Sequence, residues 1–588
     1  MNYMEFNVLS LLKREPRLKQ RQIAGKCGIS LGSANNTLKS LRKHGFITSD
    51  RTVSESGLEA LEPYRVQNAV IMAAGLSSRF APISYEHPKG TLKVRGEVLI
   101  ERQIRQLQEA SIRDIIVVVG YKKEEFFYLE DYLGVKIVVN DEYATKNNNS
   151  TIKKVEDCLG NTYICSSDNY FIENPFEEYV FDSYYASVFH EGYIDEYCLH
   201  TKGRNEWIDR AVFGGSDSWI TLGHAYWDRK YAHDFVEILD KVYDDPETAG
   251  KLWEDIYAEH IKDLRMRIRR YPAGVIWEFD SLDELREFDP FFIENVDSSV
   301  FDNICATLGC ERSDVESCVP IKQGLTNLSV KVDVKGESYV YRHPGTGTDE
   351  IINRESEAFS QGVARELGID RTYVYEDAKT GWKISRFIDG CIPFDYHNKQ
   401  HVDAAMEIAR KLHGSDAHSP WTFDVYGNAV EILGMLEGST FSDLEKLEKN
   451  SKRLNEFVKA DGVPAVLCHN DFYAPNFLVH EDGVDLIDWE YSAMSDYASD
   501  LGTFICCSDY GIDEARDAFV AYFQREPSVE ELRHCMAFVA LCAFYWFVWA
   551  LYKDKTGDPV GEWLYLWYRS AKTFGAHALH LYEGTTAS

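Results

Sequence analysis

Apolar and polar positions over residues 66–296 follow a regular order of strand, loop and helix. Asn68–Ala73 and Asp114–Val119 are continuous apolar runs, as in strands buried on both faces, and Lys136–Val139 is a third. Ile100–Ala110, between the first two, has the spacing of an amphipathic helix. This alternation predicts a doubly wound α/β domain with a mixed, largely parallel sheet and helices on both faces.

The pattern changes over residues 297–588. Leu328–Val334 and Ser338–Arg342 alternate as short strands, Arg354–Leu367 has a helical period, and the remainder is mainly helical. These features predict a separate α+β domain that begins after an acidic junction.

One apolar segment, Cys535–Tyr552, reaches the lower length limit of a membrane span. Its aromatic residues lie in the middle and the C-terminal half, whereas a spanning helix carries Trp and Tyr at both interfaces. We therefore expect a buried helix of a soluble protein and no membrane insertion.

Residues 1–63 differ from the rest in charge. Up to Asp50, nine basic residues face three acidic ones. Three segments have helical apolar spacing, and Ser30 is placed to cap the third: Met4–Leu12, Gln22–Cys27 and Leu31–Leu41. The run RQIAGKCGISLGSANNTLKSLRKHGFI resembles the winged helix-turn-helix of bacterial regulators. Such modules bind DNA or mediate assembly, and both roles stay open here.

The whole chain has 63 Lys and Arg against 95 Asp and Glu, a net charge of −32. This balance excludes a protein whose entire surface binds nucleic acid or anionic lipid. The 13 cysteines are scattered without a CxxC pair, and the N-terminus lacks a signal peptide, so a cytoplasmic protein is expected. The sequence does not indicate an oligomeric state.

The loop after the first strand carries candidate phosphate-binding chemistry. It combines small residues with two cations: Ala74, Gly75, Ser77, Ser78, Arg79 and Lys89. Backbone amides in such a turn can approach phosphate oxygens, and the cations can neutralise a triphosphate. The combination resembles the signature of the sugar-phosphate and choline-phosphate nucleotidyltransferases, which implies a Rossmann-like fold. The family usually has a second glycine where this chain has Ser77.

The match continues downstream with Asn148 and Ser150, and then with Asp168 at the end of an apolar strand. A carboxylate there can hold Mg²⁺ against the nucleotide, and Asp280 matches the family position of the second carboxylate. The resemblance implies in-line attack of an acceptor phosphate on the α-phosphorus of CTP. Positioning and charge neutralisation carry such a reaction.

The acceptor implied by this resemblance is phosphocholine. A trimethylammonium group needs aromatic faces and nearby carboxylates. The candidates are Trp207, Trp227 and Trp253 with Asp255, and we expect two of the three tryptophans to contribute.

A second motif, HNDFYAPNFL, begins at His469. Asp471 and Asn476 stand five residues apart, and Asp488 follows in IDWEY. This arrangement suits phosphoryl transfer from ATP, with Asp471 accepting a hydroxyl proton and the other two holding Mg²⁺. It resembles the bilobal kinase-like fold of aminoglycoside phosphotransferases and choline kinases.

The upstream part agrees with a kinase. Gly324, Thr326 and Asn327 precede a strand pair, as expected of a loop that covers phosphates. Arg342 stands where related kinases carry a basic residue for the α- and β-phosphates. Glu357 is its expected counterion, and Glu355 is the second choice.

Aromatic pairs near the C-terminus are candidates for a choline pocket. Trp546 and Trp549 are three residues apart on one helical face, and Tyr565 and Tyr568 repeat this spacing. Both pairs resemble pocket positions of choline kinases; an aromatic core is the alternative.

Together the motifs predict an enzyme that phosphorylates choline and then converts phosphocholine to CDP-choline. Two alternatives remain: a kinase and nucleotidyltransferase pair for another amino alcohol or a sugar, and a DNA-binding regulator that senses ligands.

Overall fold

The computed structural model describes residues 1–588 except 203–205, 324–326, 345–352, 437–440, 558–559 and 586–588. The chain divides into two compact units, Met1–Asp302 and Asn303–Ser588, and the boundary falls within α13 (Ser299–Leu308). The three expected domains, residues 1–63, 66–296 and 297–588, have limits that remain predictions.

The centre of the first unit is a seven-stranded mixed sheet in the order β10-β8-β9-β6-β1-β4-β5. β1 pairs in parallel with β4 and β6, whereas β9 runs antiparallel to both of its neighbours. The predicted mixed, doubly wound sheet is confirmed. Its strands are β1 (Asn68–Ala73), β4 (Ile115–Val119), β5 (Lys136–Val139), β6 (Thr162–Ser166), β8 (Tyr184–Thr201), β9 (Ile208–Trp227) and β10 (Arg267–Tyr271).

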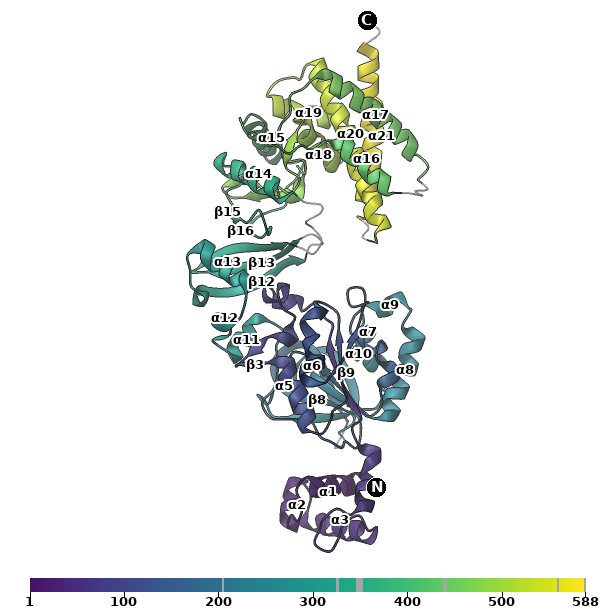
Figure 1. Cartoon of the computed structure of the whole chain (residues 1–588). Coiled ribbons are helices and arrows are strands. Elements are labelled where there is room, and N and C mark those ends of the chain that lie inside the picture. Colours follow the sequence, from purple (N-terminus) through teal and green to yellow (C-terminus); the bar gives the residue numbers. More distant parts are fainter. Residues whose placement is uncertain (203–205, 324–326, 345–352, 437–440, 558–559, 586–588) are drawn as a thin grey trace. The chain divides into compact units, whose positions relative to one another are not determined.

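Helices cover both faces of this sheet (Figure 1). α5 (Leu99–Glu109) and α6 (Tyr128–Leu133) bury their apolar side chains on one face. The opposite face packs against three helices, α7 (Asn149–Lys153), α8 (Arg229–Val242) and α10 (Trp253–Glu259). The continuous apolar runs of β1 and β4 follow from this burial on both sides. Shorter elements complete the region: α9 (Pro246–Ala249), α11 (Leu282–Phe288), α12 (Phe292–Asn295), β2 (Lys93–Val94) and β3 (Glu97–Val98).

A small antiparallel pair brings two distant carboxylates together. β7 (Asn169–Phe171) follows β6 directly and pairs with β11 (Ile276–Glu278), so that Glu278 lies opposite Asn169. Asp168 precedes β7, and Asp280 follows β11. The two aspartates therefore end at the same edge, beyond the carboxyl end of β6, where ligands bind in open α/β sheets.

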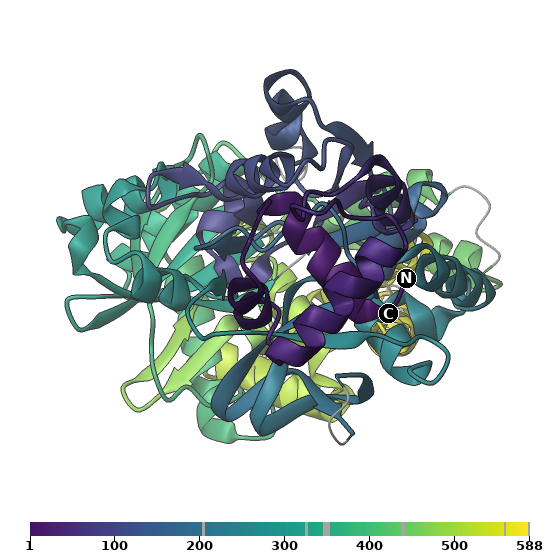
Figure 2. The same cartoon turned by 90° about the horizontal axis from the view of Figure 1, so that it is seen from below.

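The N-terminal module has the predicted helices, α1 (Tyr3–Arg14), α2 (Gln20–Lys26) and α3 (Leu31–Lys43), followed by α4 (Glu55–Leu61) (Figure 2). Ser30 caps α3, since its side chain accepts a hydrogen bond from the Ser33 amide over 3.0 Å. A bridge between Ile47 and Val53 forms the small wing. Tyr179, from the nucleotidyltransferase region, packs into the core of this module.

The second unit begins with a five-stranded antiparallel sheet in the order β12-β13-β14-β16-β15. Its strands are β12 (Val315–Gln323), β13 (Asn327–Val334), β14 (Glu337–Pro344), β15 (Tyr373–Glu376) and β16 (Lys383–Arg386), with α14 (Arg354–Glu366) beside them. Short hairpin strands then carry the second motif: β17 (Val466–Cys468), β18 (Phe477–His480), β19 (Gly483–Leu486) and β20 (Ala493–Ser495).

The remainder of this unit is helical, with one continuous apolar core. The helices are α15 (Lys399–His413), α16 (Val425–Met435), α17 (Leu444–Asp461), α18 (Ala498–Ser508), α19 (Ile512–Phe523), α20 (Val529–Lys555) and α21 (Trp563–Thr585). α20 is long and apolar enough to cross a membrane, but 83% of its most apolar window is buried. The predicted buried helix is present, and α18 and α21 pack against it.

Candidate active sites

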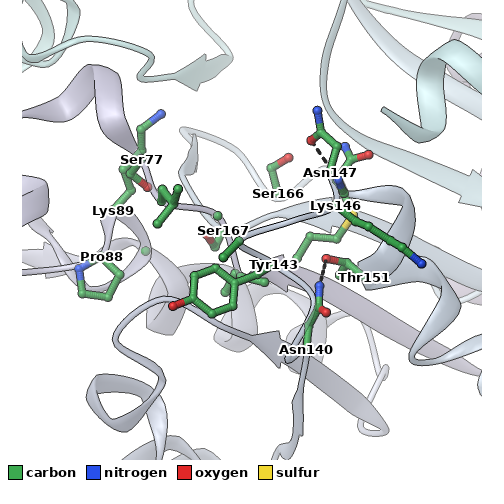
Figure 3. Close-up of a pocket in the computed structure, with 18 of the residues that line it drawn as sticks. Ser77, Pro88, Lys89, Asn140, Tyr143, Lys146, Asn147, Thr151, Ser166 and Ser167 are labelled. Carbon is green, nitrogen blue, oxygen red and sulfur yellow. Dashed lines mark hydrogen bonds between the residues drawn. The ribbon is translucent and has the colours of Figure 1, made fainter. Parts of the chain in front are cut away.

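A cavity of about 550 Å³ opens beyond the carboxyl ends of β1 and β6 in the first unit (Figure 3). The residues that line it include most of the predicted nucleotide-binding set: Ala74, Gly75, Ser77, Ser78, Lys89, Asn148 and Asp168. Ser150 is not among them. It is buried beside the cavity, where its hydroxyl donates to the Asn147 carbonyl and accepts from Asn140.

The loop after β1 has the backbone geometry of a phosphate-binding turn. Ser77 takes a left-handed conformation, with φ 52° and ψ 37°, a region that glycine enters without strain, so the glycine expected at this position would suit the turn. A Cβ atom added at Gly75 would meet no protein atom within 4 Å. Packing therefore does not require this glycine, and the open space beside it is available to a ligand.

Two cations and two carboxylates meet at the edge of this cavity. Lys89 Nζ lies 3.1 Å from Asp168 Oδ2 and 3.6 Å from Asp280 Oδ1. It also donates to the Phe279 carbonyl over 2.7 Å. Arg79 Nη2 lies 2.9 Å from the same Asp280 oxygen. Burial opposes the charge of Lys89, but the two carboxylates hold its pKa above the ordinary value.

The carboxylate set fits a divalent cation. Asp168 Oδ1 is buried and has no hydrogen-bond partner among the described residues. Burial and the nearby Asp168 and Asp280 raise the pKa of Glu278 well above its usual range. Burial and Asp280 likewise raise the pKa of Glu196 to about 7. The raised pKa values show that four carboxyl groups are crowded around two cations, a crowding that a divalent cation would relieve. Oxygen ligands are those that Mg²⁺ prefers.

The three tryptophans expected around the acceptor lie elsewhere. Trp227 is 0% exposed and Trp253 is 1% exposed, and their rings pack 5.2 Å apart in the core under the sheet. The ring of Trp207 contacts the guanidinium groups of Arg265 and Arg267, whose central carbons lie 4.6 and 4.5 Å from its centroid. None of them lines the cavity. Trp227 is a core residue and not part of an acceptor site, which corrects the prediction. The sequence could not show this, because nothing in it distinguishes a ring in the core from a ring in a binding site.

Asp255 also has a structural partner, because it caps α10 through the Leu252 amide and accepts the Tyr197 hydroxyl. Its neighbour Glu254, the other acid that follows Trp253, contacts Asn148, which lines the cavity. Glu254 accepts from Tyr185 Oη over 3.0 Å and from Asn148 Nδ2 over 3.2 Å. Burial raises the pKa of Glu254 to about 7. The adjacent acidic pair after Trp253 was the only signal for it in the sequence.

The second unit assembles the predicted phosphotransfer residues. Asn476 Nδ2 donates to Asp471 Oδ2 over 2.9 Å and to its backbone carbonyl over 2.8 Å. Burial, and then the charge of Asp488, raises the pKa of Asp471 to about 7. Asp488 has a left-handed backbone with φ 68°, a strained conformation typical of functional turns.

A buried aspartate that the sequence did not single out for a role orients this loop. Asp500, on α18, accepts hydrogen bonds from the backbone amides of His469 over 2.9 Å and Asn470 over 2.6 Å. His413 Nε2 lies 2.9 Å from the same carboxylate. Asp500 thus fixes the backbone immediately before Asp471.

Arg342, on β14, lies within the same centre. Its Nη1 is 3.5 Å from Asp488 Oδ1, and its Nη2 forms an ion pair with Glu357 Oε1. Glu357 is fully buried, whereas Glu355 is exposed, so the structure pairs Arg342 with the first of the two expected acids. Gly324 and Thr326 lie outside the described residues, as does the side chain of Asn327.

An arc of aromatic rings joins the two halves of the catalytic motif. Tyr473 follows Asp471 by two residues, and Tyr491 follows Asp488 by three. Between them, neighbouring ring centroids lie 5.4–6.4 Å apart: Tyr473 to Trp563, Trp563 to Trp567, Trp567 to Trp546, and Trp546 to Tyr491. Trp549 packs against Trp546 at 5.6 Å. The expected pair from α20 is therefore in the arc.

The expected pair from α21, Tyr565 and Tyr568, does not belong to the aromatic arc. Tyr565 is 63% exposed, and Tyr568 donates its hydroxyl to Asp443 over 2.6 Å while packing on Phe441. Trp563 and Trp567, four residues apart, occupy the helix face that Tyr565 and Tyr568 were expected to present. The prediction therefore chose the wrong face of α21. The face that α21 turns toward the arc depends on how this helix packs on α20.

These sites define a nucleotide-dependent transferase with two centres, and comparisons with known proteins agree. A family model described as choline/ethanolamine kinase matches residues 318–539. A model described as MobA-like NTP transferase domain matches residues 69–187. A model of a winged helix-turn-helix DNA-binding domain matches residues 1–48.

Curated relatives match the same two parts. The choline-phosphate cytidylyltransferase of Streptococcus pneumoniae is 34% identical over 38% of this chain and 96% of its own length. The 2-aminoethylphosphonate cytidylyltransferase of Lancefieldella rimae is 35% identical over 38% of this chain and 93% of its own. Protein LicA of Haemophilus influenzae is 26% identical over 41% of this chain and 94% of its own.

Solved structures resemble the chain in the same way. The CTP:phosphocholine cytidylyltransferase of Streptococcus pneumoniae is 34% identical, with a TM-score of 0.37, over 39% of this chain and 99% of its own. The choline kinase LicA of the same species is 23% identical, with a TM-score of 0.41, over 47% of this chain and 98% of its own. The chain belongs to the nucleotidyltransferase family that includes the choline-phosphate and 2-aminoethylphosphonate cytidylyltransferases. It also carries a choline kinase-type domain and is an enzyme with both kinds of transferase activity.

Proposed function

We propose that this protein phosphorylates choline with ATP and then transfers CMP from CTP to phosphocholine, giving CDP-choline and pyrophosphate. The observation that carries the proposal is the aromatic arc between Tyr473 and Tyr491 beside Asp471. Rings attract a quaternary ammonium through their faces, which a neutral alcohol or a sugar cannot exploit. A kinase product that the other centre of the same chain consumes gives the fusion of the two domains a chemical reason.

In the kinase centre, Asp471 accepts the proton of the choline hydroxyl as that oxygen attacks the γ-phosphorus of ATP. Asn476 keeps the carboxylate of Asp471 in place through the 2.9 Å hydrogen bond. Asn476 and Asp488 are the residues that would hold Mg²⁺, and Arg342 contributes positive charge next to Asp488. Bound Mg²⁺ neutralises charge that builds up on the phosphates.

In the nucleotidyltransferase centre, a phosphate oxygen of phosphocholine attacks the α-phosphorus of CTP, and pyrophosphate leaves. Lys89 and Arg79 offset the negative charge of the triphosphate, and the loop from Ala74 to Ser78 supplies backbone amides. Asp168 and Asp280 would hold Mg²⁺ there. This chain needs no nucleophilic side chain for the step, because the acceptor itself attacks.

The cationic head group of phosphocholine requires negative charge in the first unit. Glu254 supplies it beside Asn148 at the cavity, with Tyr185 as the adjoining aromatic residue. A primary ammonium would fit the same carboxylate by hydrogen bonding. One relative acts on 2-aminoethylphosphonate, so that this acid is the second candidate acceptor.

Rates with competing substrates test the assignment. The kinase should show the highest kcat/KM with choline, against ethanolamine, and the cytidylyltransferase with phosphocholine, against phosphoethanolamine and 2-aminoethylphosphonate. We expect a preference of at least about tenfold at the kinase centre from cation–π recognition. An equal or higher kcat/KM for ethanolamine would contradict the choline assignment while leaving both transferase activities in place.

The N-terminal module adds a second proposed role, DNA binding through α3. Lys39, Arg42 and Lys43 are exposed on this helix, although the chain as a whole is strongly acidic. We propose a cytoplasmic location, in keeping with ATP and CTP as substrates and with the absence of disulfides among the described cysteines.

A further inference from the structure

Lys383 lies directly beside the ion pair formed by Arg342 and Glu357. In the antiparallel register, Lys383 on β16 faces Arg342 on β14 and Glu376 on β15. The sheet therefore places two cations and one acid side by side on three neighbouring strands. Glu357, from α14, projects onto the same place.

The contacts make Glu357 the shared acceptor of both cations. Lys383 Nζ donates to Glu357 Oε1 over 3.0 Å, and Arg342 Nη2 pairs with the same oxygen. Lys383 is 8% exposed, and Glu357 is fully buried. Glu376 Oε1 lies 3.8 Å from Arg342 Nη2. Water is excluded from these buried side chains, so each charged group is stabilised by the opposite charges around it. Loss of one partner leaves a buried charge that water cannot solvate.

Arg342 has two tasks in this arrangement. Nη2 of its guanidinium group faces Glu357 and Glu376, and Nη1 faces Asp488, 3.5 Å away, a residue proposed to hold Mg²⁺. A single cation between two buried carboxylates would be drawn toward them. The second cation, Lys383, balances part of the negative charge of these carboxylates.

We propose that Lys383 is a positioning residue for phosphoryl transfer: by sharing Glu357, it leaves Arg342 directed toward Asp488 and the nucleotide phosphates. The inference rests on the proposed kinase reaction. It assigns to the nucleotide side of the centre a residue that the motifs did not include.

The test compares three variants of the full-length protein. K383M removes the charge but keeps an unbranched side chain, and K383R restores the charge. K379M is the matched control, since Lys379 is exposed in the turn between β15 and β16. The measurements are kcat, the KM for ATP and for choline, and the dissociation constant of the non-hydrolysable analogue AMP-PNP with Mg²⁺.

We expect K383M to raise the KM for ATP and the AMP-PNP dissociation constant by about tenfold, and to leave the KM for choline within about twofold. K383R should recover most of the loss, and K379M should match the wild type. An unchanged ATP affinity in K383M, or equal losses for ATP and choline, would overturn the inference. Should K383M fail to fold, K383Q is judged by the same criteria.

Cytidylyltransferase activity of the same preparations reports on folding of the rest of the chain. If the wild type does not phosphorylate choline, the proposed function fails. The AMP-PNP comparison still decides the role of Lys383 in that case, so that the two failures are distinguishable.

Discussion

The ammonium group of Lys89 donates a hydrogen bond to Asp168 Oδ2 over 3.1 Å, although 79 residues separate the two in the chain. The contact joins the loop after β1 to the end of β6, two strands that pair in parallel. It brings the cation for the triphosphate and a carboxylate suited to Mg²⁺ to the same edge of the sheet.

Replacement of Lys89 should therefore disable CMP transfer alone. We expect Lys89→Met to lower kcat/KM for CTP by at least about 100-fold, since it removes charge where the transition state needs it, and to leave choline phosphorylation unchanged. Pyrophosphate release measures the first activity. Lys93→Met is the control, because Lys93 is exposed on the adjacent β2. Equal loss of both activities in a folded protein would contradict two independent centres.

The reverse experiment removes the proposed base of the kinase. Asp471→Asn should reduce phosphocholine formation by about 10²–10⁴-fold, the usual contribution of a general base, while CDP-choline is still made from added phosphocholine. Asp482→Asn, in an exposed turn, should behave as the wild type. A kinase that keeps its rate after Asp471→Asn would show that another group accepts the hydroxyl proton.

The aromatic arc predicts a difference between two nearby aromatic residues. Trp549→Ala should raise the KM for choline by about tenfold and the KM for ATP by less than about twofold, because it removes one face of the arc. Tyr565→Ala should change neither value, since this side chain is 63% exposed and lies outside the arc. A choline effect from Tyr565→Ala equal to that of Trp549→Ala would favour the helical phase expected from the sequence.

Glu254 predicts a pH dependence in the nucleotidyltransferase centre. Its pKa is raised to about 7 by burial, so the carboxyl group is protonated and neutral below that pH and ionised above it. Attraction for the cationic head group requires the ionised form. The KM for phosphocholine should therefore rise by about threefold or more as the pH falls from about 8 to about 6. In Glu254→Gln this step should shrink, and the pH dependence that remains should come from the substrate phosphate and from Glu196, whose pKa is also about 7; a step of unchanged size would exclude Glu254.

DNA binding by the N-terminal module is tested with the full chain. Lys39→Glu combined with Lys43→Glu should weaken retention of upstream DNA and reduce the salt dependence of binding by about one unit of slope for each lost phosphate contact. Lys230→Glu is the control, because the Lys230 side chain on α8 is 82% exposed. Unchanged retention in the double variant would favour an assembly role for residues 1–63.

Local signals in the sequence predicted much of this architecture. The apolar runs of β1 and β4 indicated buried strands, and the spaced motif from Asp471 to Asp488 placed the kinase centre. Asp280 was harder to place, because its approach to Asp168 depends on the pairing of β11 with β7. That pairing is a long-range contact that no local period reveals.

Side-chain direction was the main limit of the sequence. Trp227 and Trp546 are both buried tryptophans, yet one lies in the core under the sheet and the other in the arc beside Tyr491. Only tertiary packing separates them. Lys383 was missed for a similar reason, since its importance comes from the register of β14 and β16 and not from a motif.

The most direct measurement follows phosphorus NMR of the purified protein with choline, ATP, CTP and Mg²⁺. The account predicts that a phosphocholine resonance appears first and is then replaced by the two resonances of CDP-choline, with ADP and pyrophosphate as the other products. Omission of CTP should stop the sequence at phosphocholine. Absence of phosphocholine, or failure to convert added phosphocholine with CTP, would contradict the central claim.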